Sequence, residues 1–464
     1  MMKMKSDLLK VKDEILGFKE IMIVSHVDAD GMTSAGITKM AFERLGIPAS
    51  VHVIRQLDRQ RVEEILDLST ENIIFTDLGS GQIANMGAIF DSRKVIIVDH
   101  HVPCGSTHNN LLFHLNSHVY GVDGSREVSG SGLTYLFSRF ISGGNQDLSP
   151  LAIVGAVGDM QTREGLSGLN KFIFDEGRGK FIDSMKDIAY FGKQTRPVYK
   201  MLSFASDPYL PGISGNEAAA NAFVGGLIEQ VNNETNCWKY WVDLSIDDKQ
   251  KITTALISDL LLRGYDTRIV TRLITDSYIL LNEIERTEMR DAMEYSTLLN
   301  ACGRHDCAAI GLDVVLGDRG KSLSSARTFL QEHRNQLAQG IKLLKESGVE
   351  CMKNVQVFKT NRIKSTIIGI VIGMAIGARI IDHRMPVVAV SDDVDPGFCK
   401  VSCRGTMPLV HRGLRLNRAM ALSLRVGGEG GGHDIAAGAK VRKEKLDEFL
   451  NIVDEEIGRQ MKSP

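Results

Sequence analysis

The sequence has almost no excess of charge of either sign: 55 lysines and arginines stand against 57 aspartates and glutamates, giving a formal net charge of −2. Binding of a polyanion would therefore have to come from a local basic cluster or from bound metal. Long hydrophobic runs are also absent. The longest, residues 367–378, contains three glycines and is too short for the ~20 residues of a membrane span. We expect a buried helix there, whose glycines allow close packing, and no membrane association.

Cysteine is sparse, and the seven cysteines show no disulfide framework, which favours a cytoplasmic setting. Residues 1–20 resemble a charged amphipathic helix without the apolar centre of a signal peptide. The pairs Cys302/Cys307 and Cys399/Cys403 could form a zinc site, but both are spaced more widely than the common C-x2-C pair. We therefore do not expect a zinc site, and we interpret Cys302 and Cys403 as small packing residues.

Short apolar runs alternate with amphipathic stretches in the first hundred residues, and a chain of 464 residues indicates two or three domains. Apolar strands separated by helices predict a parallel sheet covered on both faces. Ligands of such a sheet bind just beyond the carboxyl ends of its strands. The predicted strands are residues 21–24, 50–54, 73–75 and 95–98, and the predicted helices are 33–45, 61–68 and 149–157.

The composition changes in the middle of the chain. Residues 195–285 carry both tryptophans, Trp238 and Trp241, and are predicted to form a separate module. A second α/β region begins near Tyr295. Its predicted strands are residues 355–358, 386–390 and 398–403.

Potential metal ligands follow directly after three of the predicted strands and after the predicted helix 149–157. One such segment could be a helix N-cap or a turn. Asp28-Ala29-Asp30-Gly31 could also begin a calcium loop, but the later ligands of that loop are missing. Four coincident segments predict a metal centre instead. The ligands are His26, Asp28 and Asp30, then Asp77, then Asp99, His100 and His101, and finally Asp159.

Mixed histidine and carboxylate ligands suit Mn²⁺, with Mg²⁺ or Co²⁺ as alternatives. The ligands suffice for two ions, and two ions ~3.5–4 Å apart are a standard device for hydrolysing phosphate esters. The predicted reaction is therefore metal-assisted hydrolysis without a covalent protein nucleophile.

These motifs resemble those of the DHH superfamily of phosphoesterases, and the resemblance covers nearly the whole chain. It implies that one ion is held by His26, Asp28 and Asp77. It implies that the second is held by Asp30, Asp77, His100 and Asp159, so that Asp77 bridges the pair. His101 would lie against the substrate phosphate, and Asp99 would orient the histidines. The implied catalytic residues are Asp28, Asp30, Asp77, His100, His101 and Asp159.

The second region resembles the DHHA1 substrate domain of the same superfamily. Its glycine-rich segment implies that Gly431, Gly432 and His433 contact substrate phosphate, although a glycine run alone could be a linker and here lacks the Lys-Ser/Thr of a P-loop. Ser402-Cys403-Arg404-Gly405 resembles a segment that grips the nucleic-acid backbone, and Asn300 to Arg304 resembles a segment of RecJ nucleases. Ser402, Arg304 and Arg404 are thus predicted substrate contacts, since a guanidinium fork matches phosphate oxygens. Ordinary surface salt bridges are the alternative for both arginines.

An additional segment between Asp159 and Asn300 resembles the inserted module of archaeal RecJ-like exonucleases. The expected architecture is α/β, with a doubly wound parallel-sheet DHH domain (1–190), an inserted module (191–290), and a linker helix followed by a smaller α/β DHHA1 domain (291–464). The resemblance implies hydrolysis of single-stranded DNA or RNA in replication or repair. It also implies a partner such as the GINS complex or a DNA-unwinding helicase. We expect the insert, with Trp238 and Trp241, to dock this partner, because the module has no catalytic motif and holds both tryptophans. Alternatively, both tryptophans form the core of the insert.

Two other functions remain open on the sequence. One is hydrolysis of small substrates, namely short oligonucleotides, cyclic dinucleotides or pyrophosphate, against which the insert and the two arginines argue. The other is a non-catalytic replication scaffold, against which the complete ligand set argues. No motif predicts the cleavage polarity, the preference for DNA or RNA, or the oligomeric state.

Overall fold

The apolar runs near the N-terminus form one five-stranded sheet, in a computed structural model that describes residues 2–105, 109, 111–232 and 235–461. The strand order is β2-β1-β3-β4-β5, and all neighbouring strands are parallel. The order reverses at β1, which creates the switch point beside which doubly wound sheets bind ligands. The strands are β1 (Ile21–His26), β2 (Ala49–Ile54), β3 (Asn72–Thr76), β4 (Lys94–Asp99) and β5 (Leu112–Asn116).

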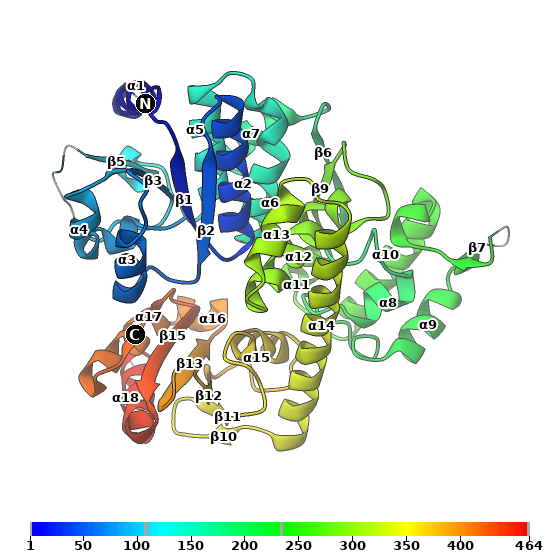
Figure 1. The fold of residues 1–464 in the computed structure, drawn as a ribbon. Helices are drawn as coiled ribbons and strands as arrows, with labels where there is room; N and C mark the ends of the chain where they lie inside the picture. Colours follow the sequence, from blue (N-terminus) through cyan, green and yellow to red (C-terminus); the bar gives the residue numbers. More distant parts are fainter. Residues whose placement is uncertain (1, 106–108, 110, 233–234, 462–464) are drawn as a thin grey trace. The chain divides into compact units, whose positions relative to one another are not determined.

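Both faces of this sheet are covered, as the continuous apolar strands predict. Ile21 and Ile23 of β1 pack toward α1 (Met2–Ile15), α2 (Ala29–Arg44) and α5 (Gly130–Ile141). Met22 and Val24 point to the opposite face, against α3 (Arg59–Leu66) and α4 (Gly87–Phe90). Figure 1 shows the blue strands β1 and β2 between α3 and α2. Each fully buried aliphatic side chain of this kind stabilises the fold by about 1.5–3 kcal/mol.

The described chain divides into two compact units. The first unit comprises Met1–Leu202 and Ala218–Leu330, and the second comprises Ser203–Glu217 and Gln331–Pro464. In the first unit, a further helical layer packs against α2 around Met32 and Ile37. The helices of this layer are α6 (Ser149–Gly158), α7 (Gly168–Gly177), α12 (Ala292–Arg304) and α13 (Ala308–Val315). The three domain ranges expected from the sequence remain predictions.

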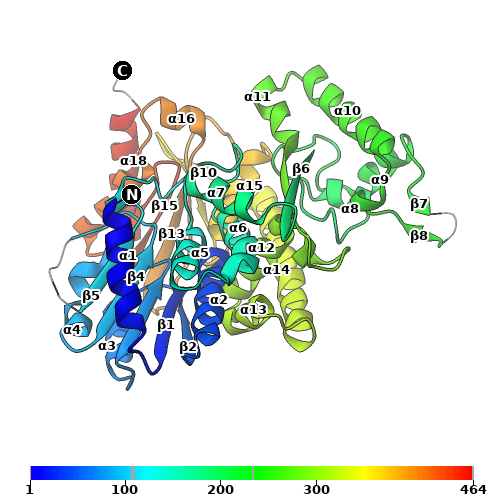
Figure 2. The same cartoon turned by 90° about the horizontal axis from the view of Figure 1, so that it is seen from above.

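An antiparallel pair, β6 (Ile182–Ile188) with β9 (Ile274–Leu280), frames the inserted segment of the first unit. Short elements lie between the two strands, and Figure 2 shows those of the first unit as a green group. Trp241 is buried, and its Nε1 donates to Asp187 Oδ1 at 2.6 Å. Trp238 is 41% exposed, and its ring lies 4.8 Å from that of Tyr199. The elements are α8 (Val198–Ser203), α9 (Glu217–Gly225), β7 (Val231–Asn232), β8 (Cys237–Trp238), α10 (Ile246–Leu262) and α11 (Thr267–Val270).

The second unit is built on a six-stranded mixed sheet with the order β10-β11-β12-β13-β15-β14. Only β11 and β12 are parallel neighbours. Phe358 faces α15 (Ile368–Gly377), whereas Val357 faces the layer of α17 (Leu416–Ala421) and α18 (Leu446–Gln460). The strands are β10 (Glu350–Cys351), β11 (Gln356–Lys359), β12 (Val387–Asp392), β13 (Phe398–Arg404), β14 (Glu429–Gly432) and β15 (Ala436–Arg442), and the remaining helix is α16 (Met407–His411). Helix α14 (Lys321–Ser347) begins in the first unit and continues into the second, which starts again at Gln331.

The glycine-interrupted apolar run forms α15, a buried helix, as predicted from the sequence. A Cβ at Gly369 would lie 2.6 Å from the guanidinium of Arg404, so a side chain there would displace the arginine. A Cβ at Gly373 would meet nothing within 4 Å, so the expectation of close packing is wrong at this position. Among the described residues, no helix combines the length and the apolar character that a membrane crossing requires.

A buried cluster of three charged residues joins the beginning of the insert to α12. Asp291 caps α12 through Met293 N at 2.9 Å, and its other carboxylate oxygen lies 3.2 Å from Lys193 Nζ. Glu294 accepts from Gln194 N at 2.8 Å. One lysine faces two carboxylates, and the pKa of Glu294 rises to about 7, mainly through burial and then through the charge of Asp291.

We expect Glu294→Gln to stabilise the protein increasingly as the pH rises. Folding raises the pKa of Glu294 above its unfolded value, so the wild type loses stability as the pH rises from about 4.5 to about 7. Glutamine does not titrate, so the variant does not lose stability in this way, and the glutamine can still accept from Gln194 N. The free energy of unfolding, from urea titrations, should favour the variant by about 1–3 kcal/mol more at pH 8 than at pH 5. The control is Glu285→Gln, because the Glu285 side chain is 79% exposed. An equal difference in the free energy of unfolding between Glu294→Gln and the wild type at both pH values would contradict the prediction.

Candidate metal centre

The loop between β1 and α2 brings His26 and Asp28 together. Asp28 is the N-cap of α2 and accepts from Gly31 N at 3.0 Å through Oδ1. Its Oδ2 lies 2.9 Å from His26 Nδ1. A Cβ at Gly31 would come within 2.2 Å of the His26 carbonyl oxygen, so this turn requires glycine. The Asp28 carboxylate therefore caps α2 with one oxygen and lies beside His26 with the other, so the N-cap role does not exclude a role as a metal ligand.

Asp30 lies in the first turn of α2 and is 1% exposed. Its two carboxylate oxygens accept from Gly130 N at 2.7 Å and from Ser131 N at 2.9 Å, at the beginning of α5. The N–H groups at a helix N-terminus are favourable hydrogen-bond donors to a carboxylate. A Cβ at Gly155 of α6 would lie 2.3 Å from Asp30 Oδ1, so the helix approaches closely only because it has glycine there.

Asp77 follows β3 and lies between the two histidines of the cluster. Its Oδ1 is 3.1 Å from His100 Nε2, and its Oδ2 is 3.8 Å from His26 Nδ1. The residue has φ of 59°, a left-handed conformation that is uncommon outside glycine, and its N–H donates to Val98 O at 3.0 Å. This backbone directs the carboxylate into the cluster, in the place where the sequence predicts a bridging ligand.

His100 follows β4 and directs a lone pair into the same cluster. Its Nδ1 lies 2.6 Å from the carbonyl oxygen of Gly124. Because a carbonyl only accepts, Nδ1 carries the proton, and in the neutral imidazole Nε2 keeps the lone pair that a metal ion would take. His100 Nε2 lies 3.6 Å from Asp159 Oδ2 and 3.7 Å from Asp30 Oδ2. The predicted ligands that follow β1, β3, β4 and α6 therefore converge.

Two buried atoms in this cluster lack a hydrogen-bond partner, namely Asp77 Oδ1 and His100 Nε2. Buried polar atoms are nearly always satisfied, so this pair indicates that the donor set fits a metal ion. The pKa of Asp77 is raised well above its ordinary value by burial, and then by the charges of Asp30 and Asp28. A cation would reverse this shift, because it favours the ionised carboxylate.

Possible ligand atoms lying within 4.8 Å of one another form three groups among the described residues. Two of these groups contain the residues of the two ligand sets that the resemblance implies, except that Asp77 is absent from the second, and the ligand assignment stays a prediction. Histidine and carboxylate donors suit Mn²⁺, Mg²⁺ or Co²⁺, and the geometry alone does not select the ion. The groups are His26, Asp28 and Asp77; Asp30, His100 and Asp159; and Asp77, Asp99, His100 and His101.

Asp99 holds His101 rather than His100. Its buried carboxylate accepts from Ser80 N at 2.9 Å and from His101 Nδ1 at 2.8 Å. The His101 side chain is 55% exposed, and its Nε2 is free of this hydrogen bond. Orientation by Asp99 thus concerns one histidine, and the Gly124 carbonyl orients the other.

The predicted phosphate contacts of the second unit gather at one end of its sheet. Arg404 of β13 is paired with Ala436, and Ser402 with Gly438. Gly431 of β14 is also paired with Gly438, so it shares a row with Ser402. His433 lies in the turn between β14 and β15, and Gly432 precedes it with φ of 134°. The register therefore brings together Ser402, Arg404, Gly431, Gly432 and His433.

Arg404 is largely buried beneath α15. One guanidinium nitrogen donates to Cys403 O at 2.9 Å, and burial lowers the pKa of the side chain. Within the part of the chain that the structure describes, no carboxylate forms an ion pair with it. A buried guanidinium without a carboxylate is costly, and a phosphate would supply the missing charge. The surface salt bridge that the sequence left open is not formed.

Arg304 is the last residue of α12, and its motif supports the loop after β1. A Cβ at the preceding Gly303 would lie 2.1 Å from Val27 O. Asn300 Oδ1 accepts from Ala29 N at 3.0 Å. The motif predicts a substrate contact only for its arginine and gives no signal for the structural role of Asn300. Arg304 belongs to the first unit and Arg404 to the second.

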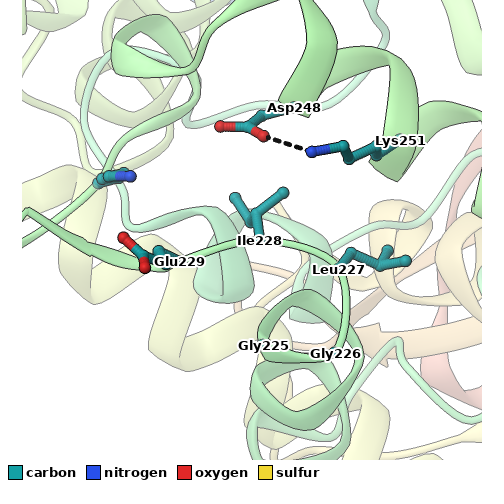
Figure 3. A pocket seen from close by; sticks show the side chains of 8 residues that line it. Gly225, Gly226, Leu227, Ile228, Glu229, Asp248 and Lys251 are labelled. Carbon is teal, nitrogen blue, oxygen red and sulfur yellow. Dashed lines mark hydrogen bonds and ion pairs between the residues drawn. The ribbon is translucent and has the colours of Figure 1, made fainter.

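A surface pocket of about 500 Å³ lies in the inserted segment, at the end of α9 (Figure 3). Asp248 and Lys251 on its rim form a hydrogen bond of 3.3 Å, and Glu229 and Ile228 also line it. None of the residues predicted to bind metal or substrate lines this pocket. This pocket is therefore separate from the candidate metal centre at the strand ends.

Three family models match the sequence: the DHH family N-terminal domain over residues 20–156, the DHH-CID domain over 190–274, and the DHHA1 domain over 353–459. An uncharacterized protein of Methanocaldococcus jannaschii is 34% identical over 459 residues, covering 97% of this chain and 96% of its own. The chain belongs to the DHH/DHHA1 family. Both the recognised resemblance and the expected α/β fold class, with a module between the two domains, are thus confirmed.

Solved structures share the fold of this DHH/DHHA1 protein. RecJ of Thermus thermophilus in complex with Mn²⁺ has a TM-score of 0.61 at 17% identity and covers 98% of this chain. This chain covers 55% of that RecJ chain, about half its length. Another exonuclease RecJ bound to manganese gives 0.59 at 16% identity, covering 98% of this chain and 94% of its own. CDC45 of Entamoeba histolytica gives 0.65 at 11% identity, with 98% and 99% covered. The chain therefore has a DHH-family phosphoesterase fold like those of RecJ and Cdc45.

Proposed function

We propose that this DHH/DHHA1 protein is a metal-dependent exonuclease that hydrolyses phosphodiester bonds of single-stranded DNA or RNA. The observation that carries the proposal is the convergence of the carboxylates and histidines after β1, β3, β4 and α6, with Asp77 Oδ1 and His100 Nε2 buried and unpartnered. The shared fold with two exonuclease RecJ structures bound to manganese supports Mn²⁺ as the ion, with Mg²⁺ or Co²⁺ as alternatives.

The residues of the first unit have separate roles in this proposal. His26, Asp28 and Asp77 would hold one ion, and Asp30, Asp77, His100 and Asp159 the other. Two such ions supply Lewis-acid stabilisation of the charge that develops on the phosphoryl oxygens. Burial by itself lowers the pKa of His101, but the hydrogen bond to Asp99 and its charge outweigh burial and raise this pKa to about 9. His101 would therefore be positively charged at neutral pH and donate from Nε2 to a phosphate oxygen.

The second unit would bind phosphates of the substrate backbone other than the phosphate that is hydrolysed. Arg404 offers a guanidinium that lacks a carboxylate partner, as described above. Gly431 lies in the exposed edge strand β14, and a Cβ there would meet nothing within 4 Å, so the space beside its backbone is open to a phosphate. His433 adds an imidazole at the adjoining turn. Arg304 of the first unit would provide a further cationic contact.

We expect Arg404→Ala to raise KM by roughly 10–100-fold, because a hydrogen bond to a charged group contributes about 1.5–3 kcal/mol. Mn²⁺ affinity and kcat should change little, since the arginine belongs to the second unit. Initial rates on end-labelled single strands, with Mn²⁺ titrated separately, measure both quantities. Arg384→Ala is the control, because this exposed arginine of the same unit already pairs with Asp382 at 2.9 Å. An unchanged KM in Arg404→Ala would remove the arginine from the substrate site.

The function itself is tested by incubating the purified protein with Mn²⁺ and short single-stranded DNA or RNA, labelled separately at each end. Pyrophosphate and a cyclic dinucleotide are included as competing substrates. Progressive shortening from one end is the expected result, and it would also establish polarity and sugar preference. Turnover of only the small substrates would replace the exonuclease with a small-molecule phosphoesterase. Bound metal without any turnover would favour a scaffold function, to which the likeness to CDC45 gives weight.

The proposal includes a replication or repair partner, either the GINS complex or a DNA-unwinding helicase, that docks on the inserted segment. Trp241 is buried and is therefore part of the core of the insert, which excludes it as a docking residue. Trp238 is 41% exposed and keeps a face available. Binding of purified GINS or helicase to the full chain, measured by size-exclusion chromatography, tests this part of the proposal, and no complex with either would refute it.

A further inference from the structure

A buried glutamine contacts the metal-ligand cluster but belongs to none of the motifs described above. Gln161 lies in the turn after α6, two positions beyond Asp159, and is 7% exposed. Its Nε2 donates to Gly124 O at 2.9 Å and lies 3.2 Å from Asp159 Oδ2. One amide group therefore contacts one predicted ligand directly and shares a carbonyl acceptor with another.

The shared acceptor is the carbonyl oxygen of Gly124. It accepts from His100 Nδ1 at 2.6 Å and from Gln161 Nε2, which together occupy both of its lone pairs. A Cβ at Gly124 would lie 1.8 Å from His100 O, so the segment is held tightly against the histidine. The position of this carbonyl determines which nitrogen of His100 keeps its proton, and hence where the Nε2 lone pair points.

A second buried amide determines how Gln161 is oriented. Asn170 is fully buried, and its Nδ2 donates to Gln161 Oε1 at 2.7 Å. Its own Oδ1 accepts from Ser129 N at 3.2 Å, which leaves Nδ2 as the group that faces the glutamine. Because Asn170 presents a donor, the oxygen of Gln161 must face it and the NH₂ group must face Gly124 and Asp159.

We propose that Gln161 is a positioning residue that sets the affinity of the ion held by Asp30, His100 and Asp159, while the group of His26, Asp28 and Asp77 is independent of it. The inference rests on the proposed function, because it assigns this residue to one of the two predicted ions. Among the described residues, the Gln161 side chain forms hydrogen bonds with Gly124, Val128, Asp159 and Asn170, and with none of His26, Asp28 or Asp77. A merely structural glutamine would weaken folding without distinguishing between the two ions.

The test is a calorimetric titration of Mn²⁺ into the metal-free full chain. The wild type should show two binding steps. Gln161→Met, which preserves length and packing, should weaken one step by roughly 10–100-fold, the usual effect of removing a partner of a metal ligand, and leave the other unchanged. His26→Ala should weaken the opposite step. Excess Mn²⁺ should restore hydrolysis in Gln161→Met, because the variant lacks affinity rather than a reacting group.

The matched control is Asn145→Ala. Asn145 is a fully buried amide of the same unit, whose Nδ2 donates to Ser138 O at 2.9 Å and whose Oδ1 accepts from Arg44 at 2.9 Å. Its loss should lower stability in urea without changing either Mn²⁺ step. If Gln161→Met proves unstable, Gln161→Ala, which leaves room for water, is titrated in its place.

Three outcomes separate the inference from the proposed function. One weakened step in the glutamine variant supports the inference. Two wild-type-like steps, or equal weakening of both, overturn it while the exonuclease proposal stands. No Mn²⁺ binding by the wild type overturns both.

Discussion

Asp77→Asn should reduce hydrolysis by at least about 10³-fold, because loss of metal-ion stabilisation costs several kcal/mol at the transition state. The Asp77 carboxylate lies between His100 and His26, with one oxygen toward each. An asparagine has a single amide oxygen and no charge, so it cannot serve both groups of ligands. The fold should survive, since asparagine has the same shape.

The same variant should respond differently to metal. In metal-free wild type, burial and then Asp30 and Asp28 raise the pKa of Asp77, so stability falls as the pH rises through that raised value. Asp77→Asn has no titrating group at this position, so it does not lose stability in this way. In EDTA at pH 8 it should unfold at the same urea concentration as the wild type or at a higher one. Mn²⁺ should stabilise the wild type strongly and the variant weakly, because only binding to the native state adds stability.

Activity assays combined with urea titrations, each with EDTA or Mn²⁺, measure both effects. Asp175→Asn is the control, because Asp175 is half-exposed and pairs with Lys171 on the surface of α7. It should behave as the wild type in every condition. Hydrolysis at the wild-type rate in Asp77→Asn, or equal stabilisation of the two proteins by Mn²⁺, would show that Asp77 is not a bridging ligand.

Gly31→Ala should have the second largest effect, through the backbone rather than through a ligand. The added Cβ would lie 2.2 Å from the carbonyl oxygen of His26 and 2.5 Å from its carbonyl carbon. These are backbone atoms, which cannot rotate away as a side chain can. The loop must shift, and we expect a loss of about 3 kcal/mol or more in the free energy of unfolding. Hydrolysis should fall about 100-fold, since a displacement of about 1 Å at a reacting centre costs that much.

Gly81→Ala provides the matched control within the same unit. A Cβ there would meet no heavy atom within 4 Å, and its backbone φ is not positive. Urea unfolding and calorimetric Mn²⁺ titration should leave this variant indistinguishable from the wild type. A Gly31→Ala protein with normal stability and normal Mn²⁺ affinity would mean that the loop after β1 tolerates a side chain and is less constrained than its contacts indicate.

The central strands could be predicted because burial on both faces leaves a continuous apolar run. Ile73 to Phe75 in β3 is an example, with every residue buried. β6 was missed for the opposite reason: its sequence Ile-Asp-Ser-Met-Lys-Asp-Ile is mostly polar, and its partner in the sheet is the single strand β9. Hydrophobic periodicity gives only a weak strand signal in a two-stranded ribbon, because both of its faces are partly exposed to water.

The ligands of the candidate site could be placed from the sequence because each follows a strand or helix end, where a parallel sheet collects its functional groups. The groups that hold those ligands could not. Gly124 acts through its carbonyl, which has no side-chain signature, and Asn300 contacts a loop 271 residues earlier in the chain. Trp238 and Trp241 show the same limit, since only tertiary packing determines that one is exposed and the other buried.

All of the predicted metal ligands belong to the first unit, whereas the cluster around Ser402, Arg404 and His433 belongs to the second. The predicted metal ligands are thus encoded in one part of the chain, and most of the predicted backbone contacts in another, with His101 and Arg304 as the exceptions. Substitutions in the second unit could therefore change how a substrate is held while the candidate metal centre is inherited intact.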